Sequence, residues 1–173
     1  MQRAEWRPQG RRRAAAIYLV GIAFFRWKRR VMSTRIAISV GDHFRFIAEM
    51  EDAAAPATCA AFRRLLPYAQ RLVHCRWSGE GCWIPLGTFQ MGVGPENSTS
   101  RPAPGELLWY PGGISETELL FPYGEVAFAC RAGSLAGNHF LTIIDGIEQL
   151  PEVGRQVLYH GAHDIRFSLD RAG

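Results

Sequence analysis

Short stretches in which every second position is apolar recur along the chain from residue 35 onward. Residues 35–40 and 43–50 both follow this pattern, and Gly41 and Asp42 separate them. Alternation with a period of two predicts strands with one buried face, and a two-residue connection containing Gly predicts a hairpin. Similar apolar segments, bounded by Gly or Pro, predict further strands at residues 70–77, 82–86, 106–110, 116–121, 126–130, 139–144 and 163–169.

Two other stretches carry apolar residues at helical spacing. The first follows Thr58, which can cap a helix, and ends before Pro67; the second runs between Gly146 and Gly161. Residues 87–105 are rich in Gly, Pro and Ser and predict a long loop. About eight strands and two helices without βαβ alternation predict a mostly β fold, a closed eight-stranded antiparallel β-barrel capped by two helices.

The positive charge of the chain is concentrated in its first 31 residues. Residues 1–31 hold nine of the 20 basic residues and one of the 16 acidic residues, which leaves 11 basic and 15 acidic residues in 32–173. An acidic domain with scattered basic residues repels a phosphate backbone, so we expect no nucleic-acid partner. The chain therefore divides into a basic N-terminal extension at 1–31 and a barrel domain at 32–173.

The extension contains an apolar run at residues 14–25 between two basic clusters. Twelve helical residues cover about 18 Å, whereas the hydrocarbon core of a membrane is about 30 Å thick, so no membrane span is predicted. The run also lacks a small-residue cleavage site, which argues against secretion. Two interpretations stay open: an amphipathic helix on a membrane surface, or a true chain start at Met32.

The common cofactor and metal signatures do not occur in this sequence. The four cysteines form no C-x-x-C pair, and His160 and His163 have no nearby carboxylate or thiol pair. There is no phosphate-binding loop, dinucleotide fingerprint or G-x-S-x-G motif. We therefore predict no cofactor and no metal, and interpret the cysteines as buried thiols of a cytoplasmic protein.

Several runs in the chain resemble one protein family. They are Arg76-Trp77-Ser78-Gly79-Glu80, Pro95-Glu96-Asn97, Trp109-Tyr110-Pro111-Gly112-Gly113, Ser115-Glu116-Thr117-Glu118 and Gly133-Ser134-Leu135-Ala136-Gly137-Asn138-His139-Phe140. In this order they resemble the bacterial cyclophilin-like proteins of domain-of-unknown-function family 3830. The resemblance covers nearly all of residues 32–169 and implies an eight-stranded barrel with two helices. It implies no established activity.

Polar residues in turns and at strand ends suggest a pocket at the rim of the barrel. The candidate ligand-binding residues are Arg76, Trp77, Glu80, Glu96, Asn97, Glu116, Glu118, Asn138, His139 and Phe140. Glu116 and Glu118 are two apart, so on a strand they would share a face, about 6.5 Å apart, and could bind a cation or divide acid and base roles. The alternatives are a solvated strand face for the glutamates, and turn formation for the asparagines.

Two functions are compatible with these residues. The first is a protein that binds, or transforms, a small metabolite in the rim pocket. The second is a prolyl isomerase or peptide-binding protein that uses Arg76 and an apolar groove formed by Trp77, Phe128 or Phe140, although Arg76 is equally well explained as an exposed strand residue. The sequence leaves the ligand, the catalytic residues and the formation of a homo-oligomer open.

Overall fold

In the computed structural model, which describes residues 33–170, the alternating segments pair into one antiparallel ladder. The extension predicted at 1–31 lies outside the described residues. The elements are β1 (Arg35–Val40), β2 (Phe44–Met50), α1 (Pro56–Arg63), β3 (Tyr68–His74), β4 (Gly79–Pro85), β5 (Ser98–Thr99), β6 (Glu106–Tyr110), β7 (Glu118–Val126), β8 (Ala129–Cys130), β9 (Gly133–Ser134), β10 (Gly137–Asp145), η1 (Ile147–Gln149), α2 (Leu150–His160) and β11 (His163–Leu169).

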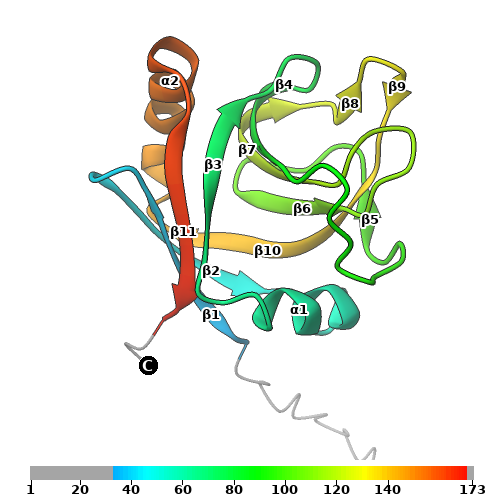
Figure 1. The fold of residues 1–173 in the computed structure, drawn as a ribbon. Coiled ribbons are helices and arrows are strands. Elements are labelled where there is room, and N and C mark those ends of the chain that lie inside the picture. Colours follow the sequence, from blue (N-terminus) through cyan, green and yellow to red (C-terminus); the bar gives the residue numbers. More distant parts are fainter. Residues whose placement is uncertain (1–32, 171–173) are drawn as a thin grey trace, which may run out of the picture. The chain divides into compact units, whose positions relative to one another are not determined.

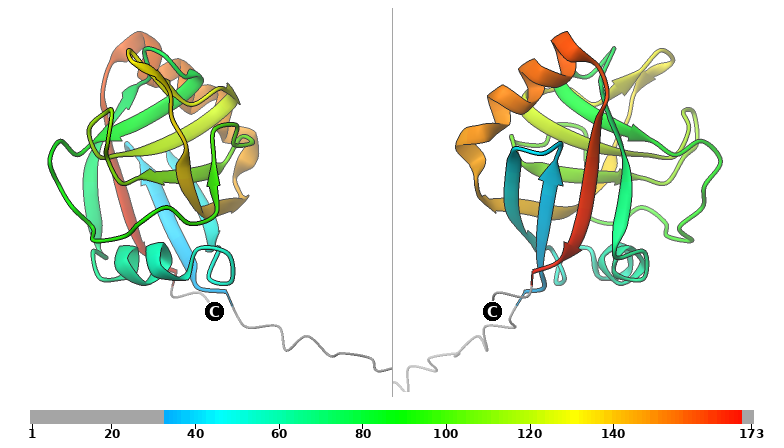
Figure 2. Two further views of the ribbon diagram at one scale, coloured as in Figure 1. Left: turned by 90° about the vertical axis from the view of Figure 1, so that its right-hand side faces the viewer. Right: turned by 60° about the vertical axis from the view of Figure 1, so that its left-hand side comes forward.

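The ladder closes on itself. Its strands follow the order β2-β1-β11-β3-β4-β7-β6-β10, and β10 pairs again with β2, so that Leu141 lies opposite Met50. The short strand β5 adds to β10 beyond β6. The views in Figure 1 and Figure 2 show the strands around one cylinder, with α1 near one end and α2 near the other. The prediction of a closed eight-stranded antiparallel barrel with two helices is confirmed for residues 33–170.

The interior of the cylinder is filled by the apolar residues that alternate along the strands. Phe62 of α1 lies against Phe140 and Phe167, with ring centroids 4.9 and 5.4 Å apart. All three rings are almost completely buried, as are Val153 and Val157 of α2. Because side chains two apart on a strand share a face, one set of alternate residues fills this main core and the other faces outward.

The outward-facing side chains of strands β4, β6 and β7 are not fully exposed, because residues 126–136 cover them. Buried residues on this side form a second apolar cluster, made of Leu108, Tyr110, Leu120, Val126, Phe128 and Leu135. Their strand neighbours Leu107 and Leu119 belong to the main core instead. The barrel wall is therefore packed on both faces here, and the covering segment, which includes the β8–β9 hairpin, creates space for a site outside the barrel.

Two predicted strand boundaries are wrong. Residues 116–121 and 126–130 are not separate strands joined by a turn at 122–124, because β7 runs without interruption from Glu118 to Val126. Pro122, which cannot donate a hydrogen bond, is tolerated opposite Gly81, next to an irregularity in the β4–β7 register. Strand β3 ends at His74, so Arg76 and Trp77 lie in the turn before β4.

The predicted cap of the first helix is also wrong. The helix begins at Pro56, a residue suited to the first helical position, and Thr58 is buried within it. Its free N–H groups are satisfied by a carboxylate from a distant segment, as described below. The second helix ends, as predicted, at Gly161, which has a positive φ of 89°.

Candidate functional site

A cavity of about 700 Å³ lies on the outer side of the barrel, between the β3–β4 connection and the segment that carries β8. Residues 73–78 and Trp83 line one side, and residues 129–132 line another. The loop before β7 contributes residues 114–116, and β7 itself contributes Glu118. Because Glu118 and Leu120 are two apart on β7, Glu118 faces the same side as the second apolar cluster.

Glu118 is the most unusual group in this cavity. It is only 6% exposed, yet its carboxylate has no hydrogen bond or ion pair with any of the described residues. Burial, and then the nearby charge of Glu116, raise the pKa of Glu118 to about 7. The group therefore exchanges its proton close to neutral pH, which is the range in which a carboxyl group can serve as either acid or base.

Glu116 lines the same cavity but is held differently. It lies in the loop before β7 rather than on the strand, and its side chain is exposed. Its carboxylate accepts a 2.8 Å hydrogen bond from the backbone N–H of Gly87. The two glutamates are thus brought to one cavity by the loop and the strand end, and not by alternation within a single strand.

Two guanidinium groups and three large apolar side chains complete the cavity. Arg76 and Arg131 are exposed, and neither forms an ion pair or a hydrogen bond within residues 33–170. Trp77 and Ile114 are 57% and 63% exposed, whereas Trp83 is half-buried. The cavity therefore combines apolar walls with unpaired groups of both charges.

The remaining polar groups of the cavity are engaged in holding its walls. The Ser78 hydroxyl donates to the Ala129 carbonyl at 3.1 Å and accepts from the Ala129 N–H at 3.2 Å, which fixes β8 to the β3–β4 connection. His74 Nε2 lies 2.8 Å from the Tyr123 hydroxyl. Burial raises the pKa of the Cys75 thiol, so this cysteine is not a thiolate nucleophile at neutral pH.

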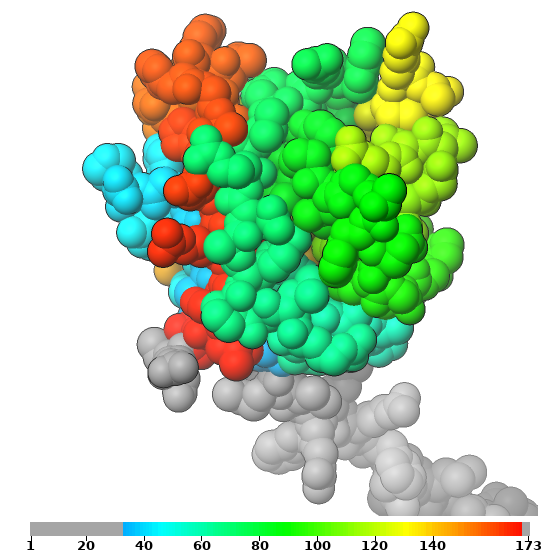
Figure 3. Space-filling view, in the orientation of Figure 1, coloured from blue at the N-terminus to red at the C-terminus, as the bar shows by residue number. Residues whose placement is uncertain are grey.

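A second group of the sequence-predicted residues anchors the long loop at residues 86–105. Asn138 is completely buried and uses its whole hydrogen-bonding capacity. Its Oδ1 accepts from the N–H of Glu96 at 3.0 Å and from the hydroxyl of Ser98 at 2.9 Å. Its Nδ2 donates to Thr58 Oγ1 at 3.0 Å and to the Gly94 carbonyl at 2.8 Å. Figure 3 shows this loop, in green, directly against the surface of α1.

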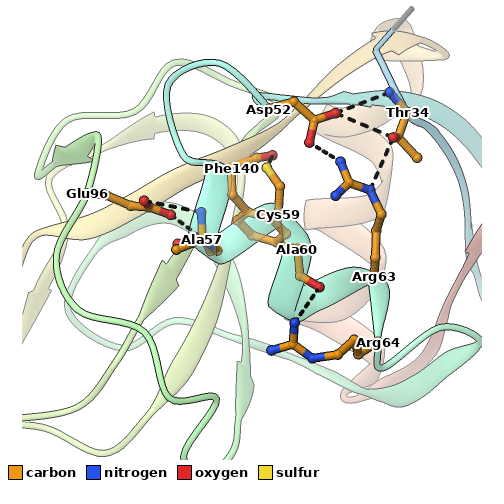
Figure 4. A network of polar contacts seen from close by, with 10 residues as sticks. Thr34, Asp52, Ala57, Cys59, Ala60, Arg63, Arg64, Glu96 and Phe140 are labelled. Atoms are coloured by element: carbon orange, nitrogen blue, oxygen red, sulfur yellow. Dashed lines mark hydrogen bonds and ion pairs between the residues drawn. The ribbon is translucent and has the colours of Figure 1, made fainter.

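Glu96 supplies the missing cap of α1. Its carboxylate accepts hydrogen bonds from the N–H groups of Ala57 and Thr58. Figure 4 shows the Glu96 carboxylate pointing toward Ala57. Burial opposes ionisation, but these hydrogen bonds outweigh it and hold the pKa of Glu96 below its usual range. On the other side of α1, Arg63 bonds Asp52 and Thr34. These contacts tie α1 to the loop and to the start of β1.

The other candidate residues lie outside the cavity. Asn97, at a positive φ of 46°, donates to the His139 carbonyl at 2.8 Å, and His139 Nε2 lies 2.9 Å from Thr142 Oγ1. Phe140 is buried in the main core, and Glu80 accepts a 2.8 Å hydrogen bond from the N–H of Glu125.

Of the ten candidates, four line one cavity, namely Arg76, Trp77, Glu116 and Glu118. The remaining six do not line it, so the candidates do not meet at a single mouth at the barrel rim. The sequence interpretation missed Arg131 and Ile114, which line the cavity as well. Arg131 is an isolated basic residue in a two-residue turn between short strands, and no spacing rule distinguishes it from a solvated surface arginine.

Within the described part of the chain, no group of three or more His, Cys, Asp or Glu side chains is arranged to hold a metal ion. In the same residues, no helix combines the length and the apolar character needed to cross a membrane. The four cysteines, which all lie in this part, are free thiols.

Solved structures that are similar to this barrel include the following two. One is McbB in complex with tryptophan, with a TM-score of 0.57 and 15% identity over 80% of this chain and 45% of that chain. The other is the solution structure of the hypothetical protein AF2241 from Archaeoglobus fulgidus, with a TM-score of 0.55 and 17% identity over 83% of this chain and 99% of that chain. This chain thus spans less than half the length of McbB, and at these identities the similarity concerns the fold alone.

The search of curated proteins found no match. The sequence profile of a family described as "Protein of unknown function (DUF3830)" matches residues 36–169, which include every strand of the barrel except the first residue of β1. The chain therefore belongs to the DUF3830 family of proteins of unknown function.

Proposed function

We propose that this protein binds a small organic molecule in the cavity beside Glu118. The observation that carries the proposal is a carboxylate that is 6% exposed, faces the cavity and lacks a hydrogen-bond donor among the described residues. Buried polar groups in proteins are nearly always hydrogen-bonded, because an unpaired one costs free energy. A ligand that donates to Glu118 would remove this cost.

The size and lining of the cavity support the same proposal. Small-molecule sites typically enclose about 300–1,000 Å³ and combine apolar walls with a few polar groups. Here the volume is about 700 Å³, the walls include Trp77, Trp83 and Ile114, and the charged groups occupy a few positions among them. The similar structure of McbB, solved in complex with tryptophan, adds support, because it contains a small organic molecule together with a related fold.

A ligand screen on the full chain tests the proposal. We expect at least one compound from a set of carboxylic acids, amines and amino acids to raise the melting temperature of the wild type. Its affinity should fall at least tenfold in Glu118→Gln, since a hydrogen bond to a charged group contributes about 1.5–3 kcal/mol. Glu148→Gln removes a carboxylate that is exposed and does not line the cavity, and it should bind like the wild type. Equal binding to wild type and Glu118→Gln would contradict the proposal.

Prolyl isomerisation is less well supported by the geometry. Phe128 and Phe140 are 2% and 0% exposed, so neither can form a groove for a proline ring. Arg76 and Trp77 remain accessible, and a coupled isomerisation assay comparing wild type with Arg76→Ala tests this alternative. The cyclophilin-like superfamily, the bacterial origin, the cytoplasmic location and a homo-oligomer stay predictions.

A further inference from the structure

The acidic and basic groups that line the cavity do not pair with one another. Glu116 and Glu118 lie close enough for the charge of one to oppose ionisation of the other. Arg76 and Arg131 line the cavity too, but neither is within ion-pair distance of these carboxylates. Among residues 33–170, no positive charge lowers the pKa of Glu118, as an adjacent guanidinium would. The cavity is thus lined by two carboxylates and two guanidinium groups that form no ion pairs with one another.

From this separation we infer that the ligand is an amino acid, bound with its ammonium group at Glu118 and its carboxylate at Arg76 and Arg131. This inference rests on the proposed function and names the class of molecule that the site takes. An ammonium group would donate to the buried Glu118 carboxylate and offset the repulsion between Glu118 and Glu116. The planar guanidinium of an arginine matches the two oxygens of a carboxylate.

The sum of the charges supports a ligand with no net charge. When Glu118 is ionised, the two arginines and the two glutamates that line the cavity cancel. A simple amine would leave both guanidinium groups unpaired, and a simple carboxylic acid would leave the buried Glu118 without a cationic partner. A zwitterion offers a partner to the carboxylate and to the guanidinium groups at once.

The apolar walls indicate the kind of side chain. The same cavity is lined by the indoles of Trp77 and Trp83 and by the side chain of Ile114. Trp77 and Ile114 are more than half exposed. Covering them with a large aliphatic or aromatic group removes apolar surface from water. The amino acid is therefore one with a large apolar side chain, rather than a small or charged one.

Calorimetric titration of the full chain at pH 8, where Glu118 is ionised, tests this assignment. The probes are L-tryptophan and L-leucine, each with its analogue lacking the carboxylate (tryptamine, isopentylamine) and its analogue lacking the ammonium group (indole-3-propionate, 4-methylpentanoate). We expect at least one amino acid to bind the wild type at least tenfold more tightly than either of its analogues, since each analogue loses one charge-assisted contact.

Variants of the cavity residues test where the ammonium group and the carboxylate of the ligand bind. Glu118→Gln should weaken the amino acid at least tenfold and leave the ammonium-free analogue within threefold. The double variant Arg76→Ala, Arg131→Ala should do the opposite, weakening the amino acid but not the carboxylate-free analogue. Glu118→Asp, which keeps the charge, should recover part of the affinity, and Glu148→Gln should match the wild type. Circular dichroism verifies that each variant is folded.

The outcomes separate this inference from the proposed function. If an analogue binds as tightly as its amino acid and still depends on Glu118, the cavity is a ligand site but the amino-acid assignment is wrong. If the compounds bind equally to all variants, both the assignment and the site at Glu118 are wrong.

Discussion

The carboxylate of Glu118 occupies a position where ionisation is costly. It is nearly buried, it shares its cavity with Glu116, and within residues 33–170 no donor compensates its charge. Burial, and then the charge of Glu116, favour the protonated form and raise the pKa of Glu118 from 4.5 to about 7. The same features that make this residue unfavourable for the free protein make it available to a ligand.

This shift predicts how stability depends on pH. The folded protein holds the Glu118 proton up to about pH 7, whereas the unfolded chain releases it near 4.5, so the folded state binds more protons between these values. The contribution of this residue to stability is therefore complete below pH 4.5 and is lost as the pH rises to about 7. The loss amounts to about 3.5 kcal/mol at most, at about 1.4 kcal/mol per pKa unit.

Urea unfolding of wild type and Glu118→Gln at several pH values checks this prediction. The stability of the variant relative to the wild type should increase between pH 4.5 and 7, because glutamine does not titrate there. Glu148→Gln is the control, since its carboxylate is exposed. A constant difference between wild type and Glu118→Gln across this range would show that the residue titrates normally.

Residue types in the sequence made Glu118 a candidate ligand-binding residue, but for a partly incorrect reason. The prediction that the two glutamates share a face required both to lie on one strand. In the structure, Glu116 lies in the loop before β7. Asn138 and His139 belong to the same class of candidates and serve other purposes. Glu118 differs from Asn138 and His139 in its burial and in its neighbours. Both depend on segments far away in the sequence.

At the scale of elements, the long loop at residues 86–105 is part of the scaffold that holds α1. Asn138 on β10 bonds the loop at Gly94, Glu96 and Ser98 and reaches Thr58 of α1, while Glu96 caps the same helix. Local sequence rules placed the cap at Thr58, because they consider only residues next to the helix. A cap supplied from 38 residues away has no local signal.

Removal of the Asn138 amide should therefore destabilise the loop and the helix together. We expect Asn138→Ala to lower the free energy of unfolding by about 3 kcal/mol, because the buried Thr58 hydroxyl and three partly buried groups lose their hydrogen bonds. Ser98→Ala removes a single contact with the same amide and should cost less than about 1.5 kcal/mol. Urea unfolding measures both values, and equal losses would mean that Asn138 is not the centre of this network.

For the whole molecule, the strand pattern together with the absence of βαβ alternation predicted a closed barrel, because closure is an economical way to bury one face of alternating strands and to remove free edges. The sequence did not reveal the second apolar cluster. Leu108 and Leu120 continue an apolar run with their neighbours, so they carry no sign of facing outward toward residues 126–136. The candidate cavity lies beside this second cluster, on the outer side of the barrel. Because no sign of the cluster is present in the sequence, the pocket was predicted at the rim instead.

The two clusters should respond separately to truncation. Phe140→Ala removes a ring from the main core and should lower global stability by about 3–5 kcal/mol, with faster hydrogen exchange in all barrel strands. Phe128→Ala affects the outer cluster and should accelerate exchange mainly in residues 126–136. Hydrogen exchange followed by mass spectrometry distinguishes the two patterns. Equal acceleration over the whole barrel in Phe128→Ala would show that both clusters unfold as one unit.

The pairing of β1 with β11 places the start and the end of the barrel next to each other. Ile36 lies opposite Leu169, and the N–H of Asp170 bonds the carbonyl of Arg35 at 3.0 Å. Paired strands are separated by about 4.8 Å, so the chain enters and leaves this domain within the width of one strand. Such a domain can be inserted into a surface loop of an unrelated host protein with little distortion of the host.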